Sequence, residues 1–445
     1  MARSRYKELV DTFAADIRAG KLPPGTRLPT HRQLASRHGL ALVTATRIYA
    51  ELCAMGLVTG ETGRGTFVRE TSLAPGLGID QQAVAADVVD LNFNYPSLPE
   101  QADLLRAALR QLAASGDIEA LLRYQPHGGR PHERAIMARH LASRGLAVDA
   151  DQVVIVNGAQ HGLATTVMAQ LQTGDVVATD ALTYSGFKVL AEAHGLELVP
   201  IPAGTSGPNL RALETLCTQR RVKAVYVQPT LHNPVGWVMS LQQRQKLVAT
   251  ARRHDVLIIE DAAYAFLAKD PPPPLFALSP ENTVYITGFA KNVATGLRVG
   301  LIAAAPARIA TLERAIRATT WNTPGVLTAI LCNWIEDGTV SRLEKEKRRD
   351  AMQRQKLVAG ILGGYTCIAH PASYFALLLL PEEVRAERIA KELIARKISV
   401  STTQPFSISS HAPHALRLAL GSVDIPALRE ALLQVRQVIE EQTDL

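Results

Sequence analysis

The chain has 445 residues, of which 47% are hydrophobic and 20% charged, so it can bury a full core, and two or three domains are expected. Its four cysteines lie far apart without a CxxC pair, which argues against a disulfide framework or a structural metal site and is typical of a reducing cytoplasm. No run of about 18 apolar residues and no apolar leader is present, so neither a membrane protein nor a secreted one is expected.

Positive charge is concentrated at the start of the chain. Residues 1–70 contain eleven basic and six acidic residues, a net charge of +5, whereas the whole chain carries +7. A basic segment joined to a nearly neutral remainder indicates that this segment meets a polyanion. On charge alone, an ordinary solvated surface explains the numbers as well.

The first 70 residues predict three helices and a hairpin. Apolar residues at helical spacing predict a helix over about 6–19, which GKLPPGTRLPT ends. HRQLASRHG predicts a short helix with Thr30 as N-cap and Gly39 as its stop, and VTATRIYAELCAMG predicts a longer one. LVTGETGRGTFV then predicts two short strands around a glycine turn. This order is the layout of a winged helix-turn-helix.

The motifs GKLPPGTRLPTHRQLA and GRGTFV resemble the GntR family of winged-helix regulators over residues 5–69. Since such a motif places its second helix in the major groove of DNA, the candidate DNA-binding residues are Arg27, His31, Arg32, Thr44, Arg47 and Arg64. The chain departs from the family at the start of the recognition helix, where Ala41 and Leu42 replace the usual Ser-Arg. A winged helix kept only for protein contacts is the alternative.

The remaining chain predicts an α/β protein in two parts. A linker is expected over 71–88, a large domain over 89–340 and a small α+β domain over 341–445. Apolar runs such as VVIVNG, DVVATD, AVYVQP, VLIIED and TVYITG alternate with amphipathic stretches, which indicates a mostly parallel sheet covered on both faces. A long polar helix is expected over about 339–362.

TGFAKNVATGLRVG carries the strongest chemical signal. Lys291 lies in a turn among small residues, where a lysine kept from water can form a Schiff base, and Arg298 follows at a spacing that suits a phosphate grip. Asp261 ends a buried strand, and Asn233 and Tyr264 offer hydrogen-bond donors. Pyridoxal phosphate needs such an anion at its ring nitrogen and donors at its ring oxygen. The amides of Gly158, Ala159 and Gln160 open a helix, which is a natural phosphate site.

This ordered set resembles the fold-type I aspartate-aminotransferase superfamily over about residues 88–440. The resemblance implies that Lys291 holds the cofactor, that Tyr184 stacks on its ring, and that Arg417 binds a substrate carboxylate. It also implies that Tyr124 reaches the phosphate of a partner subunit, hence a homodimer. Ordinary half-buried tyrosines are the alternative for Tyr124 and Tyr184. Two positions depart from the family: Gly288 and Ala290 stand where hydroxyl residues are usual.

Together the two parts resemble the MocR subgroup of GntR regulators. We therefore expect a cytoplasmic transcription regulator whose partners are an operator DNA and an amino compound, with pyridoxal 5'-phosphate as cofactor. The alternative is an active aminotransferase that carries a DNA-binding domain, and a half-reaction without turnover lies between the two. A third interpretation, a sensor of cofactor supply without an amine effector, uses the same site without Arg417.

Overall fold

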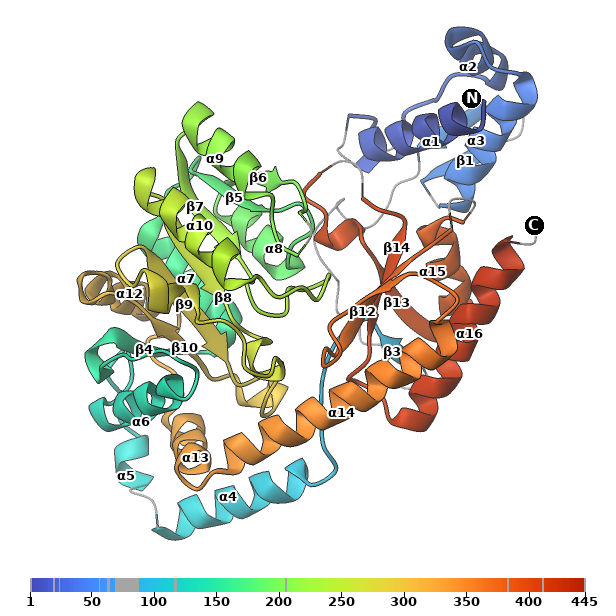
Figure 1. The fold of residues 1–445 in the computed structure, drawn as a ribbon. Coiled ribbons are helices and arrows are strands. Elements are labelled where there is room, and N and C mark those ends of the chain that lie inside the picture. The colour runs from blue at the N-terminus through green and yellow to red at the C-terminus, as the bar shows by residue number, and fades with distance from the viewer. Residues whose placement is uncertain are drawn as a thin grey trace.

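The structure is a computed structural model, and it describes residues 2–18, 21–23, 25–55, 57–61, 65–68, 88–115, 118–204, 206–381, 384–409 and 412–443. Among the helices of these residues, none combines the length and the apolar character that a membrane span requires. The described chain forms three parts, which Figure 1 shows with the first in blue at the upper right.

The first part is a winged helix-turn-helix. Its elements are α1 (Ala2–Arg18), α2 (His31–His38), α3 (Leu42–Ala54) and the antiparallel hairpin β1 (Val58–Glu61) and β2 (Gly65–Val68). Thr30 accepts a hydrogen bond from Gln33 N in a capping box, and Gly39 ends α2 at φ 61°, as the sequence predicts. Apolar side chains of all three helices, among them Val10, Leu34 and Ile48, form its core.

The second part is built on a seven-stranded sheet. In spatial order its strands are β4 (Val153–Val156), β10 (Gly300–Ala303), β9 (Thr283–Gly288), β8 (Leu257–Asp261), β7 (Val222–Val227), β5 (Val176–Asp180) and β6 (Glu197–Ile201). Neighbours are parallel except that β10 runs antiparallel to both β4 and β9. The central strands, such as β5, β8 and β10, are buried on both faces, which explains their continuous apolar runs.

Helices cover both faces of this sheet. One face packs against α7 (Gly158–Gln170), α8 (Ser185–Ala193) and α12 (Pro306–Thr319). The other packs against α6 (Pro131–Ala142), α9 (Leu210–Gln219), α10 (Leu241–Arg253), α11 (Leu275–Leu278) and α13 (Gly325–Glu336). The helices α4 (Gln101–Ser115) and α5 (Ile118–Leu121) precede α6. The prediction of a mostly parallel sheet covered on both faces is confirmed.

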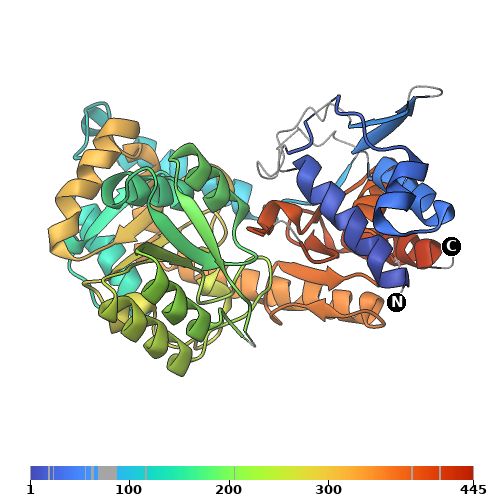
Figure 2. The same cartoon turned by 90° about the horizontal axis from the view of Figure 1, so that it is seen from above.

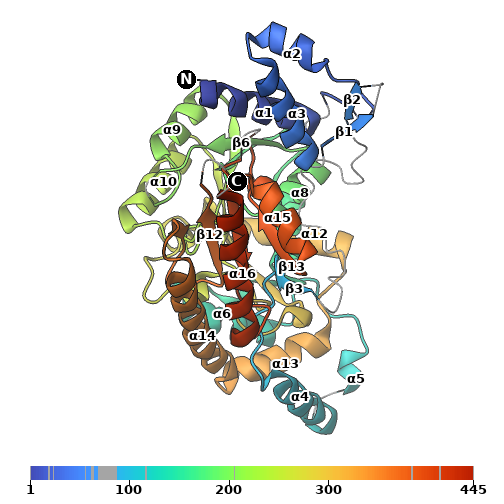
Figure 3. The ribbon, with the colours of Figure 1, turned by 90° about the vertical axis from the view of Figure 1, so that its right-hand side faces the viewer.

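The third part is a five-stranded sheet with three helices. Its strands, in spatial order, are β11 (Cys367–Ile368), β12 (Phe375–Leu379), β14 (Ala415–Ala419), β13 (Ile398–Thr402) and β3 (Val89–Leu91). Its helices are α14 (Thr339–Leu362), α15 (Ala386–Ala395) and α16 (Ile425–Thr443). Helix α14 has the predicted bounds. It reaches from α13 to the small sheet (Figure 1) and packs there beside α16 (Figure 3).

One strand lies outside the domain that the sequence assigned to it. The large domain was expected to begin at residue 89, but β3 pairs in parallel with β13, so residues 89–91 belong to the small sheet. A strand of only three residues has no sequence pattern that shows which strand it will pair with. The tertiary structure decides that pairing. The expected linker falls on residues that lie outside the described ones except for residue 88, and the other boundaries stay predictions.

The winged helix lies against the small part, as the view from above shows (Figure 2). A buried arginine of the small part, Arg385, makes this contact. Its Nη1 lies 2.7 Å from Asp11 Oδ1 of α1, and its Nε lies 3.4 Å from Glu51 Oε1 of α3.

Candidate cofactor site and DNA-binding surface

A cavity of about 570 Å³ lies where the carboxyl ends of β7, β8 and β9 face the small sheet. Its volume is in the range of small-molecule sites. Nine of the predicted residues line it: Ala159, Gln160, Tyr184, Asn233, Asp261, Tyr264, Lys291, Arg298 and Arg417. Residues far apart in the sequence therefore meet in one place, because parallel strands end at the same edge of a sheet.

Asp261 lies at the end of β8 with its carboxylate buried. Oδ2 accepts hydrogen bonds from Tyr226 Oη at 2.7 Å and Gln228 Nε2 at 2.9 Å, and Oδ1 accepts one from Ala263 N at 3.0 Å. Burial raises the pKa of Asp261 above its ordinary value, while these donors oppose that rise. The donors fix the orientation of the carboxylate, and a cationic group placed against it would hold its charge.

Lys291 lies in the loop after β9, and a side chain of α14 donates hydrogen bonds to this loop. Its Nζ donates to Asn94 O at 2.7 Å, in the segment that follows β3. On α14, the fully buried Lys347 donates to Lys291 O at 3.3 Å, Val293 O at 2.6 Å and Pro96 O at 2.7 Å. The loop that carries the lysine is therefore bonded to the helix that joins the two larger parts.

The N-terminus of α7 and Arg298 form a second corner of the cavity. Gly158 opens α7 at φ 81°, and a Cβ there would lie 3.1 Å from Arg298 Nη2. Arg298 Nη2 itself donates to Asn157 O at 3.4 Å. Free amides at a helix start and a guanidinium in contact with the same residue suit a phosphate.

Gly288 explains how β9 comes so close to this corner. A Cβ at Gly288 would lie 3.0 Å from Ala159 N, so a serine there would crowd the start of α7. The nearby hydroxyl of Thr287 donates to Ala262 O at 3.4 Å instead of facing the cavity. The departure from the family pattern thus removes a hydroxyl and leaves α7 and Arg298 at the phosphate corner.

Two tyrosines and one amide lie between these two corners. Tyr184 is the N-cap residue of α8, and burial, followed by the charge of Asp261, raises its pKa to about 12. Tyr264 is buried, and Asn233 Oδ1 is buried without a hydrogen-bond partner among the described residues. A buried amide oxygen without a partner is costly, so a ligand group that donates a hydrogen bond at this position would satisfy it.

Arg417 enters the cavity from β14 of the small sheet. It is 3% exposed; Nη1 donates to Asn92 O at 2.7 Å, and Nε is buried without a partner within the described part of the chain. The rings of Phe375 and Phe406 lie 5.4 and 5.8 Å from its guanidinium carbon. Burial lowers the pKa of Arg417. Asp90 acts on its charge without forming an ion pair with it in the described residues, so a ligand carboxylate could form that pair.

Tyr124 does not line the cavity of its own chain. Its side chain is 84% exposed, and its ring lies 5.4 Å from that of Trp321, which is 40% exposed. Leu122, at 82% exposure, is nearby in sequence. Arg317 and His127 also contact the Trp321 ring, so these exposed apolar side chains lie among polar ones.

Sequence reasoning missed several residues of the site. Tyr226, Gln228 and Phe406 line it or bond to its members, and Lys347 holds the Lys291 loop. Tyr226 and Gln228 stand in the same VYVQP run that pointed to Asn233, so their position after a buried strand was a usable signal. Lys347 carried none, because a lysine in a helix rich in charge looks solvated.

The winged helix exposes three of its six predicted DNA-binding residues. Arg27, Arg32 and Arg47 are exposed, and Arg47 lies 4.8 Å from the ring of Tyr6. His31 instead packs on Tyr49 with ring centroids 4.8 Å apart and contacts Thr46 Oγ1 at 3.2 Å. Thr44 is half-buried, and Arg64 lies outside the described residues.

Helix α3 begins without a side-chain cap, as Ala41 implies. Leu42 and Val43 follow with exposures of 48% and 80%. The first turn of the candidate recognition helix therefore offers apolar rather than charged side chains to a DNA groove.

The fold and the cavity define a domain of the pyridoxal-phosphate aminotransferase type, joined on one chain to a winged helix-turn-helix. The chain belongs to the family described as aminotransferase class I and II, whose model matches residues 86–434. Residues 5–68 match the model of bacterial regulatory proteins of the gntR family. Both predicted resemblances are thereby confirmed, and pyridoxal phosphate is the cofactor of this domain.

Two relatives share the arrangement. The chain is 25% identical to the uncharacterized HTH-type transcriptional regulator YdeF of Bacillus subtilis, over 98% of this chain and 95% of that one. It is 27% identical to the probable rhizopine catabolism regulatory protein MocR of Rhizobium meliloti, over 84% and 79%. A solved structure, LysN, an α-aminoadipate aminotransferase of Thermus thermophilus, superposes with a TM-score of 0.74 at 23% identity and covers 81% of this chain and 94% of its own. The chain is a transcription regulator with an aminotransferase-like domain.

Proposed function

We propose that the chain is a DNA-binding transcription regulator whose activity depends on pyridoxal phosphate and on an amino compound that reacts at its cavity. The observation that carries this proposal is the joint placement of Lys291, Asp261 and Arg417 around one cavity, in a chain whose small part also contacts a winged helix. The cavity residues supply a covalent anchor, a counterion for a ring cation and a grip for a carboxylate.

Each residue has a definite task in this proposal. When bound, the cofactor supplies an aldehyde carbon that condenses with amines and a ring that withdraws electrons. Asp261 holds a proton at the ring nitrogen, and Tyr226 and Gln228 keep its carboxylate in place. Asn233 and Tyr264 orient the ring by donating to its oxygen, and Tyr184 covers its face.

The phosphate and the effector are held at opposite ends. The amides at the start of α7 and Arg298 bind the phosphate. Arg417 binds the carboxylate of an amino acid and directs its amine toward Lys291. Because Arg417 belongs to the small part and the cofactor is held by the large part, an effector bound to Arg417 and to the cofactor favours one arrangement of the two parts. A ligand shifts such an equilibrium only by its difference in affinity for the two arrangements.

The test uses the full chain and the DNA upstream of its own gene. The affinity for a labelled duplex is measured by fluorescence anisotropy with cofactor-loaded and cofactor-free protein, and then with amino acids added to the loaded form. We expect the cofactor, an amino acid or both to change the DNA affinity about 5- to 150-fold, the usual size of such coupling. Equal affinity under all conditions contradicts the proposal.

An active aminotransferase is the second candidate. It is favoured by the completeness of the site, since Arg417 leaves Nε unpaired within the described residues and open to a substrate. Keto-acid release beyond one equivalent per chain, after amino acids and a second keto acid are added to the loaded protein, distinguishes turnover from a single half-reaction.

A further inference from the structure

Arg385 is an unusual residue of the small part. It precedes α15, its side chain is 2% exposed, and it faces two carboxylates of the winged helix at 2.7 and 3.4 Å, those of Asp11 and Glu51. His414 Nε2 lies 2.6 Å from the same Nη1. A guanidinium taken out of water requires such partners, and removing one side leaves an uncompensated buried charge.

The acidic side of this contact is adapted to it. Burial alone would raise the pKa of Asp11, but the neighbouring His414 and Arg385 outweigh burial, and the pKa is lowered. Asp11 and Glu51 come from α1 and α3, two of the three helices that form the core of the winged helix. The contact therefore acts on the folded winged helix as a whole and not on a peripheral loop of it.

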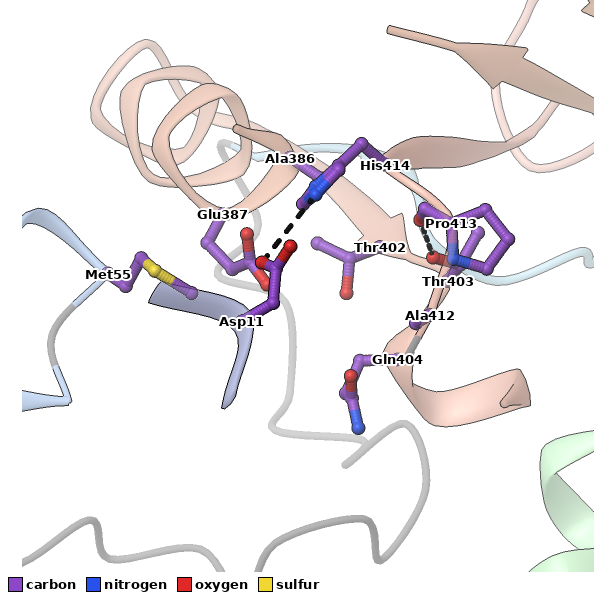
Figure 4. Close-up of a pocket in the computed structure, with 10 residues that line it drawn as sticks. All are labelled: Asp11, Met55, Ala386, Glu387, Thr402, Thr403, Gln404, Ala412, Pro413 and His414. Atoms are coloured by element: carbon purple, nitrogen blue, oxygen red, sulfur yellow. Dashed lines mark hydrogen bonds and ion pairs between the residues drawn. The ribbon is translucent and has the colours of Figure 1, made fainter. Parts of the chain in front are cut away.

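A small cavity at the contact shows which segments of the small part meet there. It is lined by Asp11 and Met55 from the winged helix and by Thr403, Gln404, Pro413 and His414 among others from the small part (Figure 4). Figure 4 also shows His414 directed toward Asp11, the two groups being 3.8 Å apart. Thr403 and Gln404 lie at the start of the turn η4 (Gln404–Phe406), and Pro413 and His414 lie directly before β14.

The same two segments line the cofactor cavity with their other ends. Phe406 of η4 and Arg417 of β14 both line that cavity. The guanidinium carbon of Arg417 lies 5.8 Å from the centre of the Phe406 ring. Phe406 O accepts a hydrogen bond from Thr183 N at 2.8 Å, next to Tyr184, and Lys188 of α8 donates to Ser407 O at 2.6 Å. Thr403 Oγ1 donates to Pro413 O, which joins η4 to the residue before His414.

We infer that the ion pair of Arg385 with Asp11 and Glu51 is the contact through which the cofactor cavity acts on the DNA-binding part, with η4 and β14 as the elements between them. This inference rests on the proposed function and names how the regulation is transmitted. A ligand that draws Arg417 or displaces Phe406 moves the elements that hold His414 and the surface around Asp11. The winged helix then has a different position, or a different freedom, in the two ligand states.

The test compares three full-length proteins. Arg385→Met alone would leave two carboxylates unpaired, so the informative variant combines Arg385→Met with Asp11→Asn and Glu51→Gln, which removes the charges from both sides. The control is Arg388→Gln on the same helix, a partly exposed arginine for which the described residues give no side-chain partner. Cofactor content by absorbance and thermal unfolding are checked first.

The readout is the ratio of DNA affinities with and without cofactor, measured on the duplex from upstream of the chain's own gene. We expect the parent and Arg388→Gln to show the same ratio, about 5-fold or more, and the triple variant a ratio within about 2-fold of one while it still binds both cofactor and DNA. A triple variant that keeps the parent ratio overturns the inference and leaves the proposed function intact. A triple variant that binds no DNA in either form also overturns it, because the contact then serves the fold of the winged helix. A parent ratio of one overturns the proposed function and this inference with it.

Discussion

At the scale of single residues, the buried ammonium of Lys347 is the main feature that the sequence did not reveal. It donates to three backbone carbonyls around the Lys291 loop. Burial, and then the positive charge of Lys291, lower the pKa of Lys347 to about 7. A helix that looks solvated in sequence thus carries a residue that positions the candidate anchor of the cofactor.

We predict that Lys347 makes the stability of the cofactor-free protein depend on pH above neutrality. An unfolded lysine keeps its proton until about pH 10, whereas folded Lys347 loses it near 7. Between these values the unfolded state binds more protons, so the free energy of unfolding rises with pH, by at most about 1.4 kcal/mol per pH unit from this residue. Urea unfolding of parent and Lys347→Met between pH 6.5 and 10 measures the difference in slope.

The control for Lys347 is Lys345→Met on the exposed side of α14. It should keep the parent's slope. At pH 7 Lys347→Met should also cost about 3 kcal/mol, because buried carbonyls lose their donors. Parallel pH profiles of parent and Lys347→Met would show that the lysine does not titrate in this range.

We predict that Lys291→Ala abolishes covalent attachment of the cofactor while the fold persists. The parent treated with borohydride should retain cofactor after denaturation, and the variant should retain none, because no other amine is expected at the end of β9. Lys188→Ala, on α8, is the matched control and should behave as the parent. Cofactor that stays attached to the reduced Lys291→Ala protein would place the anchor on another lysine.

At the scale of elements, the winged helix shows how local signals suffice for local structure. Thr30 and Gly39 cap α2 as the sequence indicates, and Gln33 completes a capping box with Thr30; each acts on residues within one turn. The recognition helix α3 starts at Ala41 without such a cap and exposes Val43. Its first turn has neither a side-chain cap nor a basic side chain, so we expect the phosphate contacts to come from neighbouring basic residues.

Arg32, exposed in the first turn of α2, should be one of those phosphate contacts. We predict that Arg32→Ala lowers affinity for unrelated DNA sequences alike and reduces the slope of log affinity against log salt by about one, since one fewer counterion is released. Titrations at several salt concentrations measure this slope. Arg429→Ala on α16, in the small part, should leave it unchanged. An unaltered slope in Arg32→Ala would place this side chain away from the phosphates.

At the scale of the whole molecule, the exposed side chains of Tyr124, Leu122 and Trp321 are a candidate contact surface for another protein chain. We predict that a second copy of the chain covers it and that Tyr124 then reaches the phosphate corner of the other copy. Sedimentation should give a dimer. Mixed dimers of a Lys291→Ala chain and a Tyr124→Phe, Arg298→Ala chain test the sharing of sites.

The mixed dimer has one site that retains Lys291. If sites are shared, that site has lost only Arg298 and should bind cofactor more tightly than the double-variant homodimer does. If each site is built within one chain, it lacks both Tyr124 and Arg298, and the two affinities should be equal. Equal affinities would therefore assign Tyr124 an ordinary surface role.

The sequence by itself determined the elements and much of the candidate site. Buried parallel strands read as continuous apolar runs, and motifs at strand ends, such as the one around Lys291, carry their chemistry in a few adjacent residues. That is why Asp261, Asn233 and Arg298 could be named, and why the structure brings them to one cavity.

Only the tertiary structure decided what meets across long distances in the chain. Three contacts show this: β3 pairs with β13, Lys347 bonds to the Lys291 loop, and Arg385 pairs with Asp11. Lys347 lies 56 positions from Lys291, and Arg385 lies 374 positions from Asp11. None of these contacts has a local signature, because a short strand, a helical lysine and a lone arginine look the same in sequence whether they are solvated or buried. Their partners are set when separate elements pack, which a periodic pattern along the chain does not encode.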